Sequence, residues 1–395
     1  MKKAKRILSV ALAVALMTMP LAGCNNNGGG SSGDVIKIGG LAPLTGEVAQ
    51  YGTAVDNAIK MAVEKINEEQ GGILGGKKIE YICYDEKGDS SEAVTMYERL
   101  LDEGVVALVG DVTSKPCKAV AQKAAADNLP MLTPTGTQED ITDVGENVFR
   151  TCFIDPYQGE LMATYAKEKL GATSAAILYD NADTYSSGIA DAFEAAAKEL
   201  GMTVTNKEGY QGGSSGSKDF NAQLTKIKAN NPDVLMLPVY YSDAALIAVQ
   251  AQAQGITSTL LGADGWDGVI EKIDASNLSA VANARFCSQY SASSTDPELQ
   301  AFLKEYKERY GMDANMFAVL GYDSMFIMAD AIDRAGSTDA EAIIAALKTT
   351  NYKGLTGTTT FDSKRNPVRE ALITGFEGDS YKFIENFSIT TGAEE

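Results

Sequence analysis

The sequence predicts an α/β protein built from two doubly wound lobes. From Val35 onward, short apolar runs alternate with amphipathic helical patterns, and this alternation starts again after Asp155. Two series of strand–helix units predict two parallel sheets flanked by helices. Most strand runs are apolar throughout, as expected for strands that are covered on both faces. The chain of 395 residues is also too long for one ordinary core and suits two lobes.

The first series of elements runs from residue 35 to residue 134. Its first helix carries Ala54, Ala58 and Ala62 at the spacing of one helix face. The expected strands are 35–42, 77–84, 105–110 and 129–134, and the expected helices are 53–70, 90–104 and 114–128. The stretch GGILGGKK (71–78) has the letters of a phosphate-binding loop, but it follows a helix and has Lys78 where Ser or Thr is required. We therefore expect a helix stop and a turn there.

The second series of elements runs from residue 162 to residue 265. The expected helices are 162–171, 186–201, 219–231 and 243–255, and the expected strands are 175–181, 203–210, 233–239 and 258–265. Right-handed crossovers make a doubly wound sheet the simplest topology for each series. In such sheets, ligands bind at the carboxyl ends of the strands.

The loops that follow the predicted strands indicate the chemistry of a ligand. They read DVTS (111–114), TPTGT (133–137), DNADTYSSG (180–188), PVYYSD (238–243) and ADGWD (263–267). These loops hold hydroxyls, aromatic rings and single acids, without a basic cluster. That combination suits a small zwitterion with an apolar body better than a nucleotide.

The N-terminal residues 1–23 are expected to form a secretory signal peptide. The basic residues Lys2, Lys3, Lys5 and Arg6 precede a short apolar run, 7–22, that ends at small residues. LAGC (21–24) resembles a bacterial lipobox, which implies a lipidated Cys24, and a signal peptide cut elsewhere is the alternative. Residues 24–34 form a polar tether. We expect an exported protein anchored to the outer face of the cell membrane, or on the periplasmic side if an outer membrane exists.

The charge of the mature chain argues against several classes of partner. Without the signal peptide, 30 basic and 53 acidic residues remain, which is a net charge of −23. Such a surface repels nucleic acid and does not favour direct binding to anionic lipid. No later apolar run approaches the length of a membrane span.

Catalysis is disfavoured because the chain has no histidine, the commonest general base and metal ligand. GGSSG (212–216) has the letters of a nucleophile elbow but lies in a Gly/Ser-rich loop. The acidic stretch 85–92 lacks the alternating acids of a calcium loop, and Asp89 or Ser90 is expected to cap the next helix. The cysteines have no metal spacing, and either disulfides or buried free thiols are open for Cys83, Cys117, Cys152 and Cys287. We expect no catalytic residue, metal or cofactor.

At the level of whole motifs, the chain resembles the branched-chain amino-acid binding proteins of bacterial ABC importers. The motifs are IKIGGLAPLTGEVAQYG, INEEQGGILGGKKIE, YDEKGDSSEAV, VGDVTSKPCKAVA, MLTPTGTQED, LYDNADTYSSG, LLGADGWD and MFAVLGYDS, in order over residues 35–390. The resemblance implies the periplasmic-binding-protein type I fold, with three strands crossing between lobes near 154–157, 286–290 and 360–363. It implies an N-terminal lobe of 35–155 plus 288–360 and a C-terminal lobe of 156–287 plus 361–395.

The resemblance also implies a set of ligand-binding residues. Ser114 and Thr137 would hold the ligand carboxylate, with simple capping as their alternative role. The Thr135 carbonyl and Asp264 would hold the ammonium, and an Asx turn is the alternative for Asp264. The complete implied set is Tyr51, Val112, Ser114, Thr135, Gly136, Thr137, Tyr185, Tyr240, Asp264, Trp266 and Phe317.

The implied function is capture of a free amino acid, Leu, Ile or Val first, by a monomer that delivers it to an ABC permease and ATPase complex. Three departures from the family pattern bear on the ligand: Asp264 stands where Glu is common, Thr135 where a small apolar residue is common, and Thr113 where a cysteine would form a disulfide. A sensor component, a binder of aromatic amino acids or amides, and a secreted enzyme are the alternatives.

Overall fold

The computed structural model describes residues 35–213, 216 and 218–389. The predicted signal peptide, Cys24 and the tether lie outside these residues, as does part of GGSSG. Among the described residues, no helix has the length and apolar character needed to cross a membrane.

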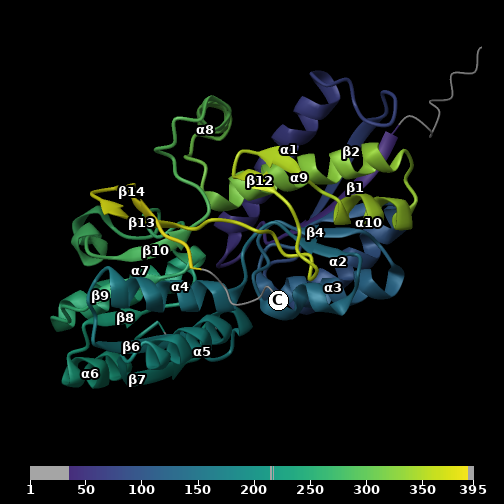
Figure 1. Ribbon diagram of the computed structural model, residues 1–395. Coiled ribbons are helices and arrows are strands. Elements are labelled where there is room, and N and C mark those ends of the chain that lie inside the picture. The colour runs from purple at the N-terminus through teal and green to yellow at the C-terminus, as the bar shows by residue number, and fades with distance from the viewer. Residues whose placement is uncertain (1–34, 214–215, 217, 390–395) are drawn as a thin grey trace, which may run out of the picture. The chain divides into compact units, whose positions relative to one another are not determined.

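The first lobe is a five-stranded parallel sheet in the order β2-β1-β3-β4-β5. Its strands are β1 (Val35–Ala42), β2 (Lys78–Asp85), β3 (Ala107–Val109), β4 (Met131–Thr133) and β5 (Val148–Arg150). Helices α2 (Ser90–Glu103) and α3 (Ser114–Asp127) pack together on one face, and α1 (Ala49–Glu68) and α9 (Met316–Ala335) on the other (Figure 1). Leu108 faces the first pair, whereas Ala107 and Val109 face the second, because side chains alternate along a strand.

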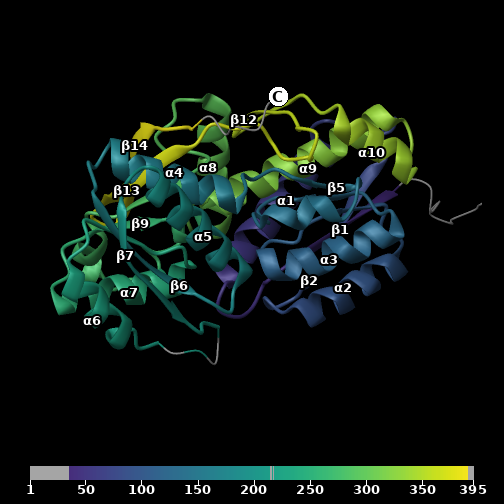
Figure 2. The same ribbon diagram turned by 60° about the horizontal axis from the view of Figure 1, so that its bottom comes forward.

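The second lobe is a seven-stranded sheet in the order β14-β13-β10-β9-β8-β6-β7. Its strands are β6 (Ser174–Asp180), β7 (Thr203–Tyr210), β8 (Val234–Met236), β9 (Thr259–Gly262), β10 (Arg285–Ser288), β13 (Leu372–Glu377) and β14 (Ser380–Asn386). Helices α4 (Asp155–Glu168) and α5 (Thr184–Glu199) cover one face, and α6 (Asn221–Asn230) and α7 (Tyr241–Gln254) cover the other (Figure 2).

The prediction of two α/β lobes is confirmed, and the four strands predicted for the second lobe pair in parallel, but its sheet also contains antiparallel strands that were not predicted. Strand β13 pairs antiparallel with both β10 and β14. The reason is local: β13 and β14 are joined by a tight turn in which Gly378 adopts a positive φ of 64°, and such a turn can join only antiparallel strands. Helix α4 also begins at Asp155, earlier than expected, with Pro156 in its first turn.

The remaining elements lie mostly over the first lobe. They are α8 (Pro297–Tyr310), α10 (Ala340–Lys348), the hairpin β11 (Tyr352–Gly354) and β12 (Gly357–Thr359), and the 3-10 turns η1 (Glu139–Val144), η2 (Asp264–Trp266) and η3 (Ala275–Val281). Arg365 lies in the segment 361–395, which the family resemblance assigns to the C-terminal lobe, but it contacts β5 of the first lobe. These contacts are to the carbonyl of Val148 and the backbone N–H of Arg150. The lobe boundaries inferred from the family stay predictions.

Two alternatives left open by the sequence are resolved by the structure. GGILGGKK forms a turn between α1 and β2, as expected. Cys83, Cys117, Cys152 and Cys287 are all free thiols, three of them buried and Cys83 half-buried.

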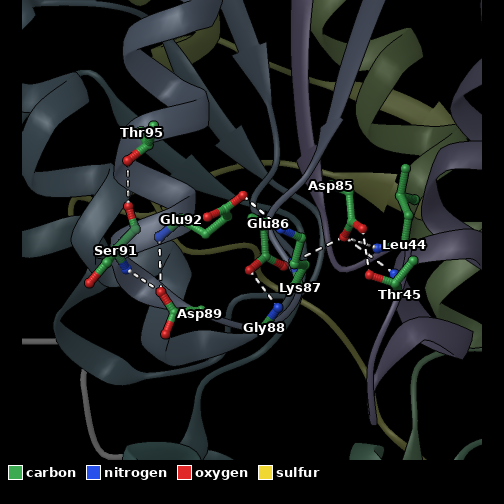
Figure 3. Close-up of polar contacts among 10 residues, drawn as sticks. All are labelled: Leu44, Thr45, Asp85, Glu86, Lys87, Gly88, Asp89, Ser91, Glu92 and Thr95. Atoms are coloured by element: carbon green, nitrogen blue, oxygen red, sulfur yellow. Dashed lines mark hydrogen bonds and ion pairs between the residues drawn. The ribbon is translucent and has the colours of Figure 1, made fainter.

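At the two ends of the loop between β2 and α2, carboxylates accept hydrogen bonds from backbone N–H groups of the first lobe (Figure 3). Asp89 accepts hydrogen bonds from the backbone N–H groups of Ser91 and Glu92, 2.9 Å each, so the prediction of a capping residue is confirmed for Asp89. Asp85 accepts from the backbone N–H groups of Leu44 and Thr45 at 2.9 and 3.2 Å. It therefore ties the end of β2 to the loop that follows β1.

Glu86 in this loop is a fully buried acid. One carboxylate oxygen accepts from the N–H of Gly88 at 2.8 Å, and the other has no hydrogen-bond partner among the described residues (Figure 3). Burial, and then the neighbouring Asp111 carboxylate, raise the pKa of Glu86 to about 10. Burial raises the pKa of Asp111 to about 7. The Glu86 carboxyl therefore keeps its proton in the folded protein at neutral pH.

Replacing Glu86 by Gln is expected to make the free energy of unfolding less dependent on pH. The unfolded chain loses the Glu86 proton near its ordinary pKa of 4.5, whereas the folded chain keeps it. Stability contributed by this proton is present at low pH and is lost as pH rises toward the folded pKa. The amide cannot ionise. The free energy of unfolding of Glu86→Gln should therefore rise relative to that of wild type by roughly 1–3 kcal/mol as the pH increases from about 5 to about 8.

Urea denaturation across this pH range measures the difference. Glu92→Gln is the matched control, because Glu92 lies in the same region, is partly exposed and pairs with Lys87. Parallel curves for wild type and Glu86→Gln would contradict the prediction.

Candidate functional site

The carboxyl ends of strands from both sheets converge on one junction between the lobes. The first lobe contributes the segments after β3 and β4 and the start of α1, and the second contributes the start of α5, the start of α7 and η2. In the first sheet this junction lies where the strand order reverses between β1 and β3, the usual ligand position in a doubly wound fold.

The first lobe brings two hydroxyls together at the start of a helix. Ser114 is the first residue of α3, and its Oγ lies 3.3 Å from the Oγ1 of Thr137. Both side chains are buried. The first N–H groups of α3 have no partner within the helix, and the helix dipole favours negative charge there. This corner can hold a carboxylate.

The loop after β4 is held rigidly under this corner. Thr135 Oγ1 donates to the carbonyl of Val112 at 2.8 Å, which joins two of the predicted residues. Arg150 is fully buried and donates to the carbonyls of Gly136 and Gln138 at 3.0 and 2.8 Å. A Cβ on Gly136 would lie 2.7 Å from Cys117 Sγ. Glycine is thus required there by the packing of the loop itself.

The predicted aromatic residues form one continuous group across the lobes. Tyr51 stacks on Phe317 with ring centroids 3.9 Å apart, and it meets Tyr240 edge-on at 5.7 Å. Tyr240 in turn stacks on Tyr185 at 4.7 Å. Tyr51 and Phe317 belong to the first lobe, and the other two belong to the second. These rings provide an apolar wall with hydroxyls at its edges.

Asp264 is a buried acid at the start of η2 in the second lobe. Its Oδ1 accepts from the hydroxyl of Tyr185 at 2.7 Å, and its backbone N–H donates to Gln158 Oε1 at 2.9 Å. Burial raises the pKa of Asp264 to about 6, despite the hydrogen bond from Tyr185. The carboxylate therefore favours a cation that would compensate for its loss of water.

Trp266 lies apart from the ring group. Its indole N–H donates to the carbonyl of Leu237 at 2.8 Å, and its ring lies against Phe376 and over Gly262. This placement is in the core of the second lobe, so a role as a roof over a ligand stays a prediction only.

Two openings flank the junction. A cavity of about 440 Å³ is walled by 46–48 and 87–89 of the first lobe and by Asp180, Asp183 and Tyr240 of the second. A groove of about 580 Å³ on the α4–α5 side is lined in part by Gln138, Asp155 and Thr184. Thr184 Oγ1 donates to Gln138 Oε1 at 2.6 Å across the lobes.

Sequence reasoning missed Tyr241 and Gln158. The hydroxyl of Tyr51 donates to the carbonyl of Gly265 at 2.5 Å and accepts from the N–H of Tyr241 at 3.2 Å. The hydroxyl of Tyr241 donates to the carbonyl of Glu47 at 2.6 Å. The doubled tyrosine at 240–241 was the available signal for Tyr241. The sequence signal for Gln158 was weaker: it is a polar residue three positions after Asp155, near the start of a helix.

The chemistry of these residues can suit a small zwitterion. The first lobe offers a hydroxyl corner for an anion, and the second offers Asp264, whose partner Tyr185 belongs to the group of aromatic rings. Within residues 35–213, 216 and 218–389, no group of three or more cysteine, aspartate and glutamate side chains is arranged to hold a metal ion.

Comparison with known proteins places the chain among solute-binding proteins. The sequence profile of the periplasmic binding protein family matches residues 35–377. A Leu/Ile/Val-binding protein, BraC3, of Rhizobium johnstonii is 32% identical over 87% of this chain and 89% of its own. A leucine-, isoleucine-, valine-, threonine- and alanine-binding protein of Pseudomonas aeruginosa is 28% identical over 84% of this chain and 87% of its own.

Solved structures with similar folds also belong to binding proteins. A leucine-binding protein, LivK, of Thermotoga maritima has a TM-score of 0.82 and 32% identity, covering 89% of this chain and 99% of its own. A branched-chain amino-acid transporter substrate-binding protein, LivJ, of Streptococcus pneumoniae in complex with isoleucine has a TM-score of 0.81 and 31% identity, over the same shares of the two chains.

Replacing Tyr51 by Phe is expected to weaken the contact between the lobes. The change removes one hydroxyl and leaves two buried backbone groups, on Gly265 and Tyr241, without their partner. Such a loss should lower the free energy of unfolding by about 1–3 kcal/mol. Urea denaturation measures it, with Tyr84→Phe as the control, because the Tyr84 hydroxyl makes an exposed bond to Glu103. Equal effects of the two variants would contradict the prediction.

Proposed function

Since the chain belongs to the periplasmic binding protein family, we propose that it captures a free aliphatic amino acid between its two lobes and delivers it to an ABC importer. The observation that carries this proposal is the separation of chemistry between the lobes. The Ser114–Thr137 hydroxyl pair suits a carboxylate, Asp264 suits an ammonium, and the aromatic rings adjoin Asp264 through Tyr185.

Leucine, isoleucine and valine are the proposed ligands. The names of the relatives and the isoleucine complex of the Streptococcus pneumoniae protein support this class. The apolar wall of Tyr51, Tyr185, Tyr240 and Phe317 suits an aliphatic side chain. Burying such a side chain contributes roughly 1.5–3 kcal/mol. Asp264 has a shorter side chain than the Glu common in the family, which leaves room for a water or a shifted ammonium.

The proposed mechanism is a clamp. The amino acid first contacts Ser114, Thr137 and the carbonyl of Thr135 on the first lobe. Closure of the second lobe then brings Tyr185, Tyr240 and Asp264 over it and removes water. Each charge-assisted hydrogen bond contributes about 1.5–3 kcal/mol in such a site. After ordering costs, a dissociation constant near or below about 1 μM, or about −8 kcal/mol, is expected.

The proposed location follows from the N-terminal segment. A lipidated Cys24 anchors a monomer to the outer face of the membrane, where the tether 24–34 keeps the closed form near its permease. The absence of histidine supports binding without turnover. Unchanged ligand after incubation, measured by mass spectrometry, separates this function from that of an enzyme.

Thermal unfolding of the mature protein against each of the twenty amino acids tests the ligand class. A true ligand at a hundredfold excess over its dissociation constant should stabilise the protein by about 2.7 kcal/mol. Leucine, isoleucine or valine is expected to give the largest shift. Ser114→Ala should reduce that shift, whereas Ser293→Ala, at an exposed serine, should not. If no amino acid moves the transition, the proposed function is wrong.

Cys24→Ser is expected to release the protein from membranes. The thiol is the attachment point of the proposed lipid, and the change to Ser removes it. Fractionation of cells into membrane and soluble fractions measures the effect, and Cys83→Ser is the control. Membrane retention of the Cys24→Ser protein would contradict lipidation at this position.

A further inference from the structure

A groove of about 440 Å³ lies away from the junction that is proposed to hold the amino acid. Its walls are the segment after β10, the start of α8, the turn between β11 and β12, and strands β13 and β14. The groove shares no lining residue with either opening at the junction. Its volume falls in the range of small-molecule sites, roughly 300–1,000 Å³. We call it the β14 groove.

The β14 groove is lined without charge. Among the described residues that form its walls, every side chain is a hydroxyl, an amide, an aliphatic group or an aromatic ring. This contrasts with a chain that carries 53 acidic and 34 basic residues. An ion that entered the groove would lose water without meeting an opposite charge, and this loss is costly. The groove therefore selects an uncharged ligand.

One wall of the groove contains a buried amide that lacks partners. Gln289 is 5% exposed, and its Oε1 has no hydrogen-bond partner among the described residues. Within the same residues its Nε2 has only the Sδ of Met316, a weak acceptor, at 3.9 Å. Buried amide groups are normally hydrogen-bonded. The Gln289 side chain therefore lacks a donor that the protein does not supply.

The groove also combines free polar groups with an exposed ring. Phe383 on β14 lines the groove and is 37% exposed, which is unusual for a large aromatic side chain. The side-chain polar groups of Ser293, Thr295 and Asn386 have no partner among the described residues. Leu299 adds to the apolar surface. A ligand of this groove thus needs both an apolar face and uncharged hydrogen-bonding groups.

From this combination we infer that the β14 groove binds a neutral saccharide. A pyranose ring has an apolar C–H face that can lie on Phe383, and hydroxyls around its edge. One hydroxyl can donate to Gln289 Oε1, and others can pair with Ser293, Thr295 and Asn386. An acyl chain has no donor for the amide, whereas an amino acid or a phosphate ester brings charges that these walls do not balance. The inference does not depend on the proposed function.

Saturation-transfer NMR of the mature protein tests the ligand class. The probes are D-glucose, D-galactose, D-mannose and N-acetyl-D-glucosamine, with glucose 6-phosphate as the charged counterpart. At least one neutral sugar should receive saturation, with a dissociation constant of about 1 mM or lower. Glucose 6-phosphate should bind about 10-fold more weakly than glucose, because its phosphate finds no cation in the groove.

Two variants locate the binding site. Gln289→Leu keeps the size of the side chain but removes the amide, and it should weaken sugar binding about 3- to 10-fold. Phe383→Ala removes the ring from an exposed position and should weaken binding about 10-fold. Met312→Ala is the control, because Met312 is 47% exposed and does not line the groove. Circular dichroism and the melting temperature check that each variant is folded, and the leucine-induced thermal shift should match that of wild type in all three.

Three results would overturn the inference: no saturation of any neutral sugar, equal affinities for glucose and glucose 6-phosphate, or wild-type sugar affinity in a folded Gln289→Leu or Phe383→Ala protein. A protein that binds a sugar in this groove but no amino acid would support the inference and contradict the proposed function.

Discussion

The polar groups at the junction of the two sheets are cut off from water, so each needs a partner in the protein or in a ligand. Most find one in the protein. Tyr51 donates to Gly265, Tyr185 donates to Asp264, and Arg150 is occupied by loop carbonyls. Asp155 does not find one among the described residues.

The two lobes contribute opposite chemistry to this junction. Helix α3 begins at Ser114 and directs its positive end toward the hydroxyl corner, whereas the second lobe brings the acid of η2. In the proposed arrangement, the first lobe can offer an ammonium only the uncharged carbonyl of Thr135, and the charged partner, Asp264, comes from the second lobe. A ligand that bridges the two lobes would gain its second set of hydrogen bonds only when the lobes close, which couples capture of the ligand to closure.

Much of this arrangement could be predicted from the sequence, and particular residues show why. Strand ends at Val109, Thr133 and Gly262 could be located because apolar runs stop near them, and parallel sheets bring such ends to one edge. Asp89 could be predicted as a helix cap because capping is local. The antiparallel hairpin β13–β14 and the early start of α4 at Asp155 could not, because pairing partners and helix ends depend on what packs around them.

The sequence by itself determined the fold class, the family, the absence of histidine chemistry, and which loops could carry a ligand, since these depend on periodicity, composition and local turns. Only the tertiary structure decided which side chains are left without water and without a partner. Trp266 and Gly136 proved to be occupied by packing in the core, whereas Gln158 Nε2 has no hydrogen-bond partner among the described residues. Burial and hydrogen bonding are properties of residues far apart in the chain, and they arise only when both sheets are in place.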